Sequence, residues 1–174
     1  MKLNKDNKIN LYVLIMSSIL GGIFGFLYET IFYKIDLGYF VKRGSTYGPW
    51  IPIYIIGSLL IVLITYKYKN KPYLVFLLNV IITGLLEYFT GYILFKYFNT
   101  RLWDYNIEIL NYGNINGYIC LRSVLFFGLS SLFLIYILVP NLIKLYKNYT
   151  KQFKLVTIIL SISVLIDIII YNMR

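Results

Sequence analysis

Five long apolar stretches, separated by short polar segments, dominate the pattern of this chain. They occupy residues 9–33, 49–66, 73–98, 118–140 and 155–173. A helix needs about 20 apolar residues to cross the hydrocarbon core of a bilayer, and each stretch is near that length. Lysines precede the first stretch, as in a signal peptide, but the stretch is too long for one and lacks a small-residue cleavage site. We therefore expect an all-α integral membrane fold, with residues 1–174 forming a single transmembrane domain of five transmembrane helices.

The composition agrees with a bundle buried in lipid. The chain is 59% hydrophobic and only 14% charged, whereas a soluble domain is about a quarter charged. It has no histidine and one cysteine, which excludes histidine-dependent catalysis, histidine metal sites and a disulfide within the chain. It also has no glycine-rich phosphate loop for ATP hydrolysis. We expect no catalytic residues, no metal and no cofactor.

The formal net charge of +10 indicates membrane orientation rather than nucleic-acid binding, because the basic residues flank the apolar stretches. One predicted side contains the N-terminus and residues 67–72 and 141–154, with ten lysines against one acid, Asp6. The other side has seven basic residues against six acids. The positive-inside rule predicts a bacterial inner-membrane protein with a cytoplasmic N-terminus and an external C-terminus, surrounded by lipid.

The type of basic residue also differs between the two sides. The inner side has only lysines, whereas all four arginines lie toward the outer side, mixed with carboxylates. A lysine resists translocation as a hydrated charge, while the planar fork of an arginine matches a carboxylate or a phosphate. We therefore predict one polar site toward the outer leaflet. Its candidate residues are Glu29, Arg43, Glu87, Arg101, Trp103, Asp104, Tyr105 and Arg122.

Two of these candidates, Glu29 and Glu87, are carboxylates inside apolar stretches. An acid at the centre of a span costs about 2.5–3.5 kcal/mol on insertion scales, so such residues are usually paired or functional. In one interpretation they line a polar cavity and bind a cation, a proton or a substrate amine. In the other they pair with arginines and lock the bundle. The candidate partners are Arg43, Arg101 and Arg122.

The longest connection, residues 99–117, holds Asp104 between the aromatic residues Trp103 and Tyr105. The two aromatic residues suit the headgroup interface, and Asp104 can meet any of the three arginines. Asp167, in the last stretch, is either a further member of this network or hydrated near the outer surface.

The segment that follows Arg43 leads into the second stretch. Pro49 and Pro52 suit the first turn of a helix, where the missing N–H costs little. The segment is either a helix entry with an aromatic anchor or an anion site, formed by N–H groups at the helix start beside an arginine.

The spacing of charges suggests an internal repeat. Glu29 and Arg43 are 14 residues apart, and so are Glu87 and Arg101. Each glutamate lies in a glycine-containing stretch, and each arginine follows the end of that stretch. We predict that helices 1–2 and 3–4 are related hairpins of parallel topology, with coincidence as the alternative. Membrane proteins built from repeats often place their site at the repeat interface.

These residues also give the chain a resemblance to a known family, the ABC-transporter type IV permeases, also called CmpB-like integral membrane proteins. The similarity runs from about residue 25 to residue 128. It is carried in order by Gly25 with Glu29, Arg43-Gly44, Gly48-Pro49, Pro52-Ile53-Tyr54, Glu87-Tyr88, Thr90-Gly91, Trp103-Asp104-Tyr105, Asn111, and Gly117 with Ile119-Cys120-Leu121. The chain departs from the family at Tyr118, where the family favours arginine, and Arg122 one turn later offers a cation instead.

The resemblance implies a transporter permease without naming a substrate. Because the chain contains no ATPase domain, this role implies a separate ATPase subunit docked on the lysine-rich cytoplasmic face. We predict a permease-like subunit, not an enzyme, that handles a small or lipid-like solute at the outer polar site. One alternative is a non-transporting scaffold or sensor whose charge network is structural, and another is a membrane enzyme acting on lipid headgroups. The sequence leaves the substrate and the oligomeric state open.

Overall fold

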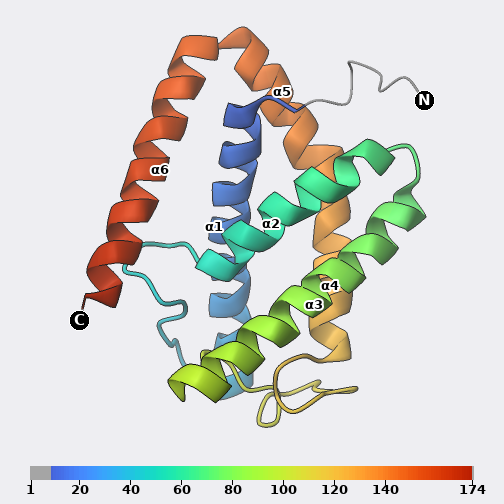
Figure 1. Cartoon of the computed structure of the whole chain (residues 1–174), viewed down its shortest axis with the longest axis vertical. Helices are drawn as coiled ribbons and strands as arrows, with labels where there is room; N and C mark the ends of the chain where they lie inside the picture. Colours follow the sequence, from blue (N-terminus) through green and yellow to red (C-terminus); the bar gives the residue numbers. More distant parts are fainter. Residues whose placement is uncertain (1–8, 174) are drawn as a thin grey trace.

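The computed structural model describes residues 9–173, and its long elements are all helices (Figure 1). These residues contain no β-strand, only an isolated bridge between Ile115 and Ile119. The elements are α1 (Leu11–Leu37), α2 (Pro52–Thr65), the 3₁₀ turn η2 (Tyr66–Tyr68), α3 (Pro72–Phe98), α4 (Leu121–Phe133), the π-helical turn η3 (Leu134–Leu138), α5 (Val139–Asn148) and α6 (Thr150–Asn172). The all-α membrane fold is confirmed.

Four of the five predicted spans correspond to helices that are long and apolar enough to cross a membrane. These are α1, α3, the continuous helix Leu121–Asn148 formed by α4, η3 and α5, and α6. The second span is shorter than predicted, because α2 has 14 residues and is about 21 Å long.

The fourth span was predicted to end at Pro140, but the helix continues beyond it. A proline inside a helix lacks its N–H and clashes with the carbonyl group four residues earlier. The π-helical turn η3 lies directly before Pro140 and widens the helix there, so the chain passes the proline without breaking. Part of the predicted 141–154 connection is therefore helical.

The helix α2 is short because it begins halfway along α1. The Ile51 N–H donates to the carbonyl oxygen of Gly22 at 3.2 Å. Gly22 precedes Leu37, the last residue of α1, by 15 residues, so α2 begins about 22 Å in from that end. Residues 38–51 therefore turn back into the bundle before α2 starts, as Figure 1 shows. We call this segment the re-entrant loop.

Glycines on α1 allow α2 to pack closely against it. A Cβ atom on Gly21 would overlap the side chain of Ser58, and one on Gly25 would overlap the ring of Tyr54. Gly21 and Gly25 are four residues apart on one face, which is the small-residue spacing of tightly packed membrane helices.

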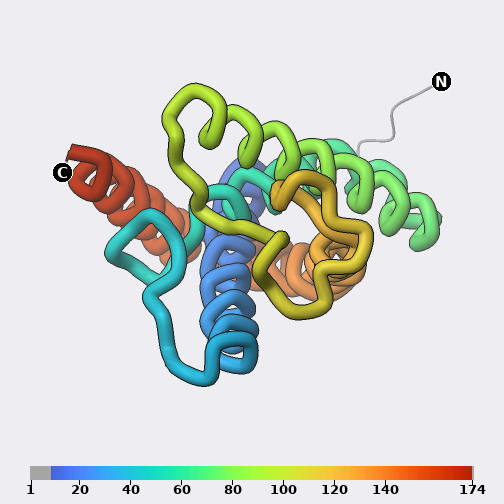
Figure 2. The backbone as a smooth tube through the Cα atoms, turned by 90° about the horizontal axis from the view of Figure 1, so that it is seen from below, coloured from blue at the N-terminus to red at the C-terminus, as the bar shows by residue number. Residues whose placement is uncertain are grey.

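The two ends of the bundle differ in chemistry. One end contains the start of α1, the turn between α2 and α3, and the turn between α5 and α6; we call it the lysine end. Seven lysines of the described chain lie there: Lys67, Lys69, Lys71, Lys144, Lys147, Lys151 and Lys154. The predicted topological residues Lys2, Lys5, Asp6, Lys8 and Arg174 lie outside the described residues. The opposite end, which carries the re-entrant loop and the 99–120 loop, is the loop end (Figure 2).

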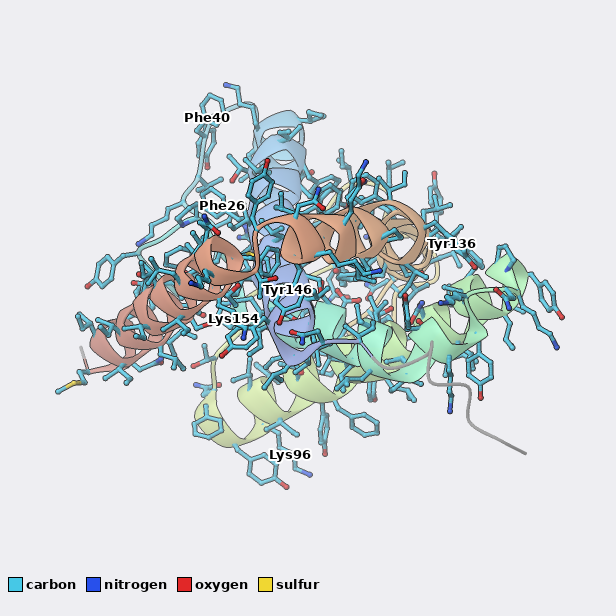
Figure 3. All side chains as sticks on the ribbon, turned by 90° about the horizontal axis from the view of Figure 1, so that it is seen from above. Phe26, Phe40, Lys96, Tyr136, Tyr146 and Lys154 are labelled. Atoms are coloured by element: carbon cyan, nitrogen blue, oxygen red, sulfur yellow. The ribbon has the colours of Figure 1, made fainter. Side chains whose placement is uncertain are left out.

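Apolar residues concentrate in the half of the bundle nearer the lysine end. A buried cluster there joins all the long helices and includes Val13, Met16, Ile61, Val62, Val75, Ile135, Val139 and Phe153. Tyr146 covers this cluster at the lysine end. Its hydroxyl accepts a hydrogen bond from Asn10 at 3.3 Å, and its ring stacks on Tyr12. Lys154 lies at the same end of the bundle, with its Nζ 5.3 Å from the centre of the Tyr12 ring (Figure 3).

Replacing Gly25 with alanine is expected to destabilise the bundle. The new methyl group must push the Tyr54 ring out of the α1–α2 contact, and such overpacking costs about 1–3 kcal/mol. The apparent melting temperature in detergent micelles should fall. Gly57→Ala is the matched control, since its Cβ would meet only Leu86 Cδ2 at 3.6 Å. Equal melting temperatures for the two variants would contradict the tight contact.

Candidate functional site

The re-entrant loop brings Arg43 onto α1. Arg43 Nε donates to Glu29 Oε2 at 2.9 Å, and both side chains are only 17% exposed. The guanidinium also lies 3.7 Å from the centre of the Tyr33 ring. Such a charge-assisted pair, stacked on an aromatic face, is favourable for an arginine. One of the pairings predicted for Glu29 is therefore formed.

A second ion pair lies beside it. Arg122 Nη2, at the start of α4, donates to Glu108 Oε2 at 2.6 Å, and the Tyr33 hydroxyl donates to the other carboxylate oxygen. Glu108 belongs to the 99–120 loop, and its side chain is 4% exposed. Burial raises the pKa of the Glu108 carboxyl above its ordinary value, against the opposing effect of the hydrogen bonds from Tyr33 and Arg122.

Glu108 was not among the residues predicted from the sequence. It lies between two isoleucines in a loop, and nothing in that setting distinguishes it from a surface acid. One signal was present, because Glu108 and Arg122 are 14 residues apart, as are Glu29 and Arg43.

The third buried carboxylate, Glu87 on α3, forms no ion pair within the described chain. Instead it accepts hydrogen bonds from the Tyr105 hydroxyl and from Ser123 Oγ, the latter at 2.8 Å. Burial, followed by the charge of Glu87, holds the pKa of the Tyr105 phenol well above its ordinary value. Tyr105 therefore keeps its proton and is a buried hydrogen-bond donor to Glu87, a member of the polar cluster instead of an aromatic anchor at the headgroup interface.

The predicted counterpart pair, Glu87 with Arg101, does not form. The helix α3 continues to Phe98, which is 11 residues and about 16 Å beyond Glu87, so Arg101 is carried away from it. Arg101 Nη1 instead binds Asp104 at 2.9 Å, three residues along the chain. The proposed repeat of helices 1–2 and 3–4 is not confirmed, since only the first hairpin has a re-entrant loop that returns its arginine.

Asp167 on α6 anchors the re-entrant loop. Its carboxylate accepts hydrogen bonds from the backbone N–H groups of Tyr47 and Gly48, at 2.9 and 2.8 Å, and from Trp50 Nε1 at 2.7 Å. Non-helical backbone at membrane depth requires such partners, because lipid provides none. Asp167 therefore lies apart from the arginine pairs and fixes the position of the loop that carries Arg43.

Two cavities adjoin the Glu29–Arg43 pair. The smaller, of about 30 Å³, is bordered by three acids, Glu29, Glu87 and Glu108, and by one cation, Arg122, and has room for a water molecule. We call it the acid cavity. The larger, of about 360 Å³, is bordered by Lys42, Arg43, Arg101 and Glu29, and we call it the basic cavity.

Glu29, Ile53 and Trp103 border both cavities, so one wall separates an acidic space from a basic one. Trp103 is fixed in this wall because its Nε1 donates to the carbonyl oxygen of Tyr118 at 2.9 Å. Cys120 lies close by at the start of α4, where it is 1% exposed.

Comparison with known proteins agrees with this membrane architecture. A family model described as "Putative ABC-transporter type IV" matches residues 16–171, which is nearly the whole chain. No curated protein and no solved structure matches the chain significantly. The resemblance seen in the sequence is thereby confirmed at the level of the family.

Substituting Asp167 with asparagine is expected to loosen the re-entrant loop. The amide keeps one acceptor oxygen but turns an NH₂ group toward donors, which costs about 1–3 kcal/mol for the unsatisfied group. Hydrogen exchange at the Tyr47 and Gly48 amides should accelerate by about tenfold. Asp36→Asn is the control, because Asp36 accepts from Ile109 N in the other loop. Unchanged exchange in the Asp167 variant would show that the loop is held by other contacts.

Proposed function

Because the chain belongs to the ABC-transporter type IV family, we propose that it is the membrane-embedded, permease-like subunit of a transporter, and not an enzyme. One observation carries this proposal beyond the family label. The helix α2 begins inside the bundle, and its first turn borders the basic cavity. Interrupted helices that end at a charged cavity near the membrane midplane are a common construction for solute sites in transporters.

The Glu29–Arg43 pair is the element that we propose to respond to a solute. An anion that enters the basic cavity competes with Glu29 for Arg43, because it binds the N–H groups that Glu29 leaves free and is attracted to the same positive charge. Glu29 would then be released toward the acid cavity. Since one ion pair lies in the wall between the two spaces, binding on one side changes the charge on the other.

The distribution of charge supports an orientation for this subunit. The lysine end has seven lysines in the described chain, and every acid of that part lies in the half nearer the loop end. By the positive-inside rule the lysine end faces the cytoplasm, and both cavities open toward the exterior half. A separate ATPase subunit would dock on the lysine end, where its acidic residues would meet these lysines.

A scaffold role remains the second candidate, and one observation favours it. The described residues form three ion pairs, and each arginine in them already has a carboxylate partner. Such a network can lock a bundle without binding any solute. The two candidates differ in what happens when a complete pair is removed.

Purification from the native cell in a mild detergent is expected to retain an ATPase subunit with this chain. The triple change of Lys144, Lys147 and Lys151 to glutamate should release it, because it reverses the charge of the proposed docking face. Mass spectrometry of the purified complex measures the retention. Lys34→Glu with Lys96→Glu, at the loop end, is the control and should retain the subunit. Absence of any ATPase from the wild-type complex would argue against an ABC-type role.

Removing both charges of the wall pair separates the transporter from the scaffold. Glu29→Gln and Arg43→Gln, each alone, leave a buried charge without its partner and should cost about 3–5 kcal/mol, seen as a lower melting temperature. The double variant should regain most of that stability. If the chain is a transporter subunit, the purified complex that contains the double variant should still hydrolyse ATP only at the basal rate. Recovery of both stability and full activity would instead support a structural pair.

A further inference from the structure

We propose that the basic cavity binds an anionic amphiphile, with a phosphate or carboxylate headgroup against Lys42, Arg43 and Arg101 and an acyl chain leaving along α2 and α3. The inference rests on the proposed function, because it names the class of solute for the same site. It is argued from the chemistry of the two walls of the cavity.

The polar wall is lined mainly by cations. Lys42, Arg43 and Arg101 border the cavity, Glu29 is the one acid among its lining residues, and Asp104 outside the lining balances Arg101. Lys42 forms no ion pair within the described chain, and its ammonium group rests on the rings of Tyr47 and Tyr171 at 4.8 and 5.2 Å.

The two arginines have donors left for a ligand. A guanidinium has five N–H donors. In Arg43 one contacts Glu29 and another reaches the carbonyl oxygen of Leu102 at 3.5 Å. In Arg101 the contact is with Asp104. The remaining N–H groups have no acceptor in the described part of the chain, so the pairs orient the arginines without saturating them. The first turn of α2 adds the positive end of a helix dipole to this wall.

The other wall is apolar and reaches the flank of the bundle. Ile53, Ile56 and Leu86 border the cavity, and Ile56 is 49% exposed. Leu102 lies at the rim and is 44% exposed. In the view of Figure 2 the start of the 99–120 loop passes over the start of α2, and residues from both, Leu102 and Ile53 among them, border the cavity. A free inorganic anion would leave this apolar wall uncovered, whereas an acyl chain would cover it.

The volume of the cavity agrees with a headgroup rather than with a whole lipid. About 360 Å³ lies within the range of small-molecule sites but is too small for two acyl chains. The headgroup would therefore occupy the cavity while the chain remains in the bilayer. This arrangement allows a ligand to enter sideways from the membrane.

Trp103 provides the test, because it borders the cavity. The purified protein is reconstituted into vesicles that contain phosphatidylcholine with either brominated phosphatidylglycerol or brominated phosphatidylcholine, and quenching of tryptophan fluorescence is measured. We expect stronger quenching by the anionic lipid. The double variant Lys42→Gln with Arg101→Gln should lower the apparent affinity for it by about fivefold for each cation removed.

Matched variants separate the cavity from the general attraction of a basic protein to anionic lipid. Lys96→Gln, an exposed charge that does not border the cavity, should keep the wild-type preference. The variant Trp103→Phe keeps Trp50 as its one tryptophan. Its fluorescence should show no stronger quenching by the anionic lipid, because the tryptophan that borders the cavity is gone. Circular dichroism and size exclusion identify any variant that fails to fold, and the single Lys42→Gln, at an exposed position, then replaces the double variant.

The outcomes decide between sources of the anion. A preference that persists in millimolar inorganic phosphate supports a lipid ligand, whereas its loss in phosphate, with a higher melting temperature, assigns the site to free phosphate and overturns the proposal. Equal quenching by both lipids, or an unchanged preference in the double variant, overturns it as well.

Because the assay needs neither ATP nor transport, lipid preference without a copurifying ATPase would reject the transporter proposal and keep the lipid site. A copurifying ATPase without any lipid preference would keep the transporter proposal and reject the lipid site.

Discussion

The hydrogen bonds that Asp167 accepts from the re-entrant loop are the interaction on which the rest of this architecture depends. Backbone that enters a bilayer without helical hydrogen bonds must find acceptors within the protein. One carboxylate on α6 accepts from two backbone amides and one indole, and so permits the loop to reach the middle of α1. The short α2, the position of Arg43 and the basic cavity all follow from that depth.

The sequence predicted four of the five spans well because each of them is an apolar run of the length that lipid demands. It also identified Glu29 and Arg43, since a carboxylate in such a run calls for a cation. It failed where the path of a loop decides the outcome. The same spacing of 14 residues joins Glu29 to Arg43 but leaves Glu87 with Tyr105 and Ser123, because the 99–120 loop returns Tyr105 to this glutamate while its arginine binds Asp104. No local pattern in the sequence shows which residue of a returning loop reaches the buried carboxylate.

Stability and chemistry are divided along the membrane normal. The apolar cluster lies in the half nearer the lysine end, where η3 carries the long helix past Pro140. The close glycine contacts between α1 and α2 lie near the middle of the bundle. The buried carboxylates lie in the other half, each satisfied by different donors: an arginine for Glu29, an arginine with a tyrosine for Glu108, and two hydroxyls for Glu87. The half nearer the lysine end is thus held by apolar packing, whereas the half nearer the loop end is held by polar contacts that can change partners.

The position of Cys120 gives the protein a natural reporter. It is the single thiol of the chain, and it is buried at the point where the 99–120 loop meets α4, two residues before Arg122. A sulfhydryl reagent can reach it only when that loop lifts away from the helices beneath. The rate at which this sulfur is alkylated therefore reports how often the 99–120 loop moves away from the helices, without any introduced mutation.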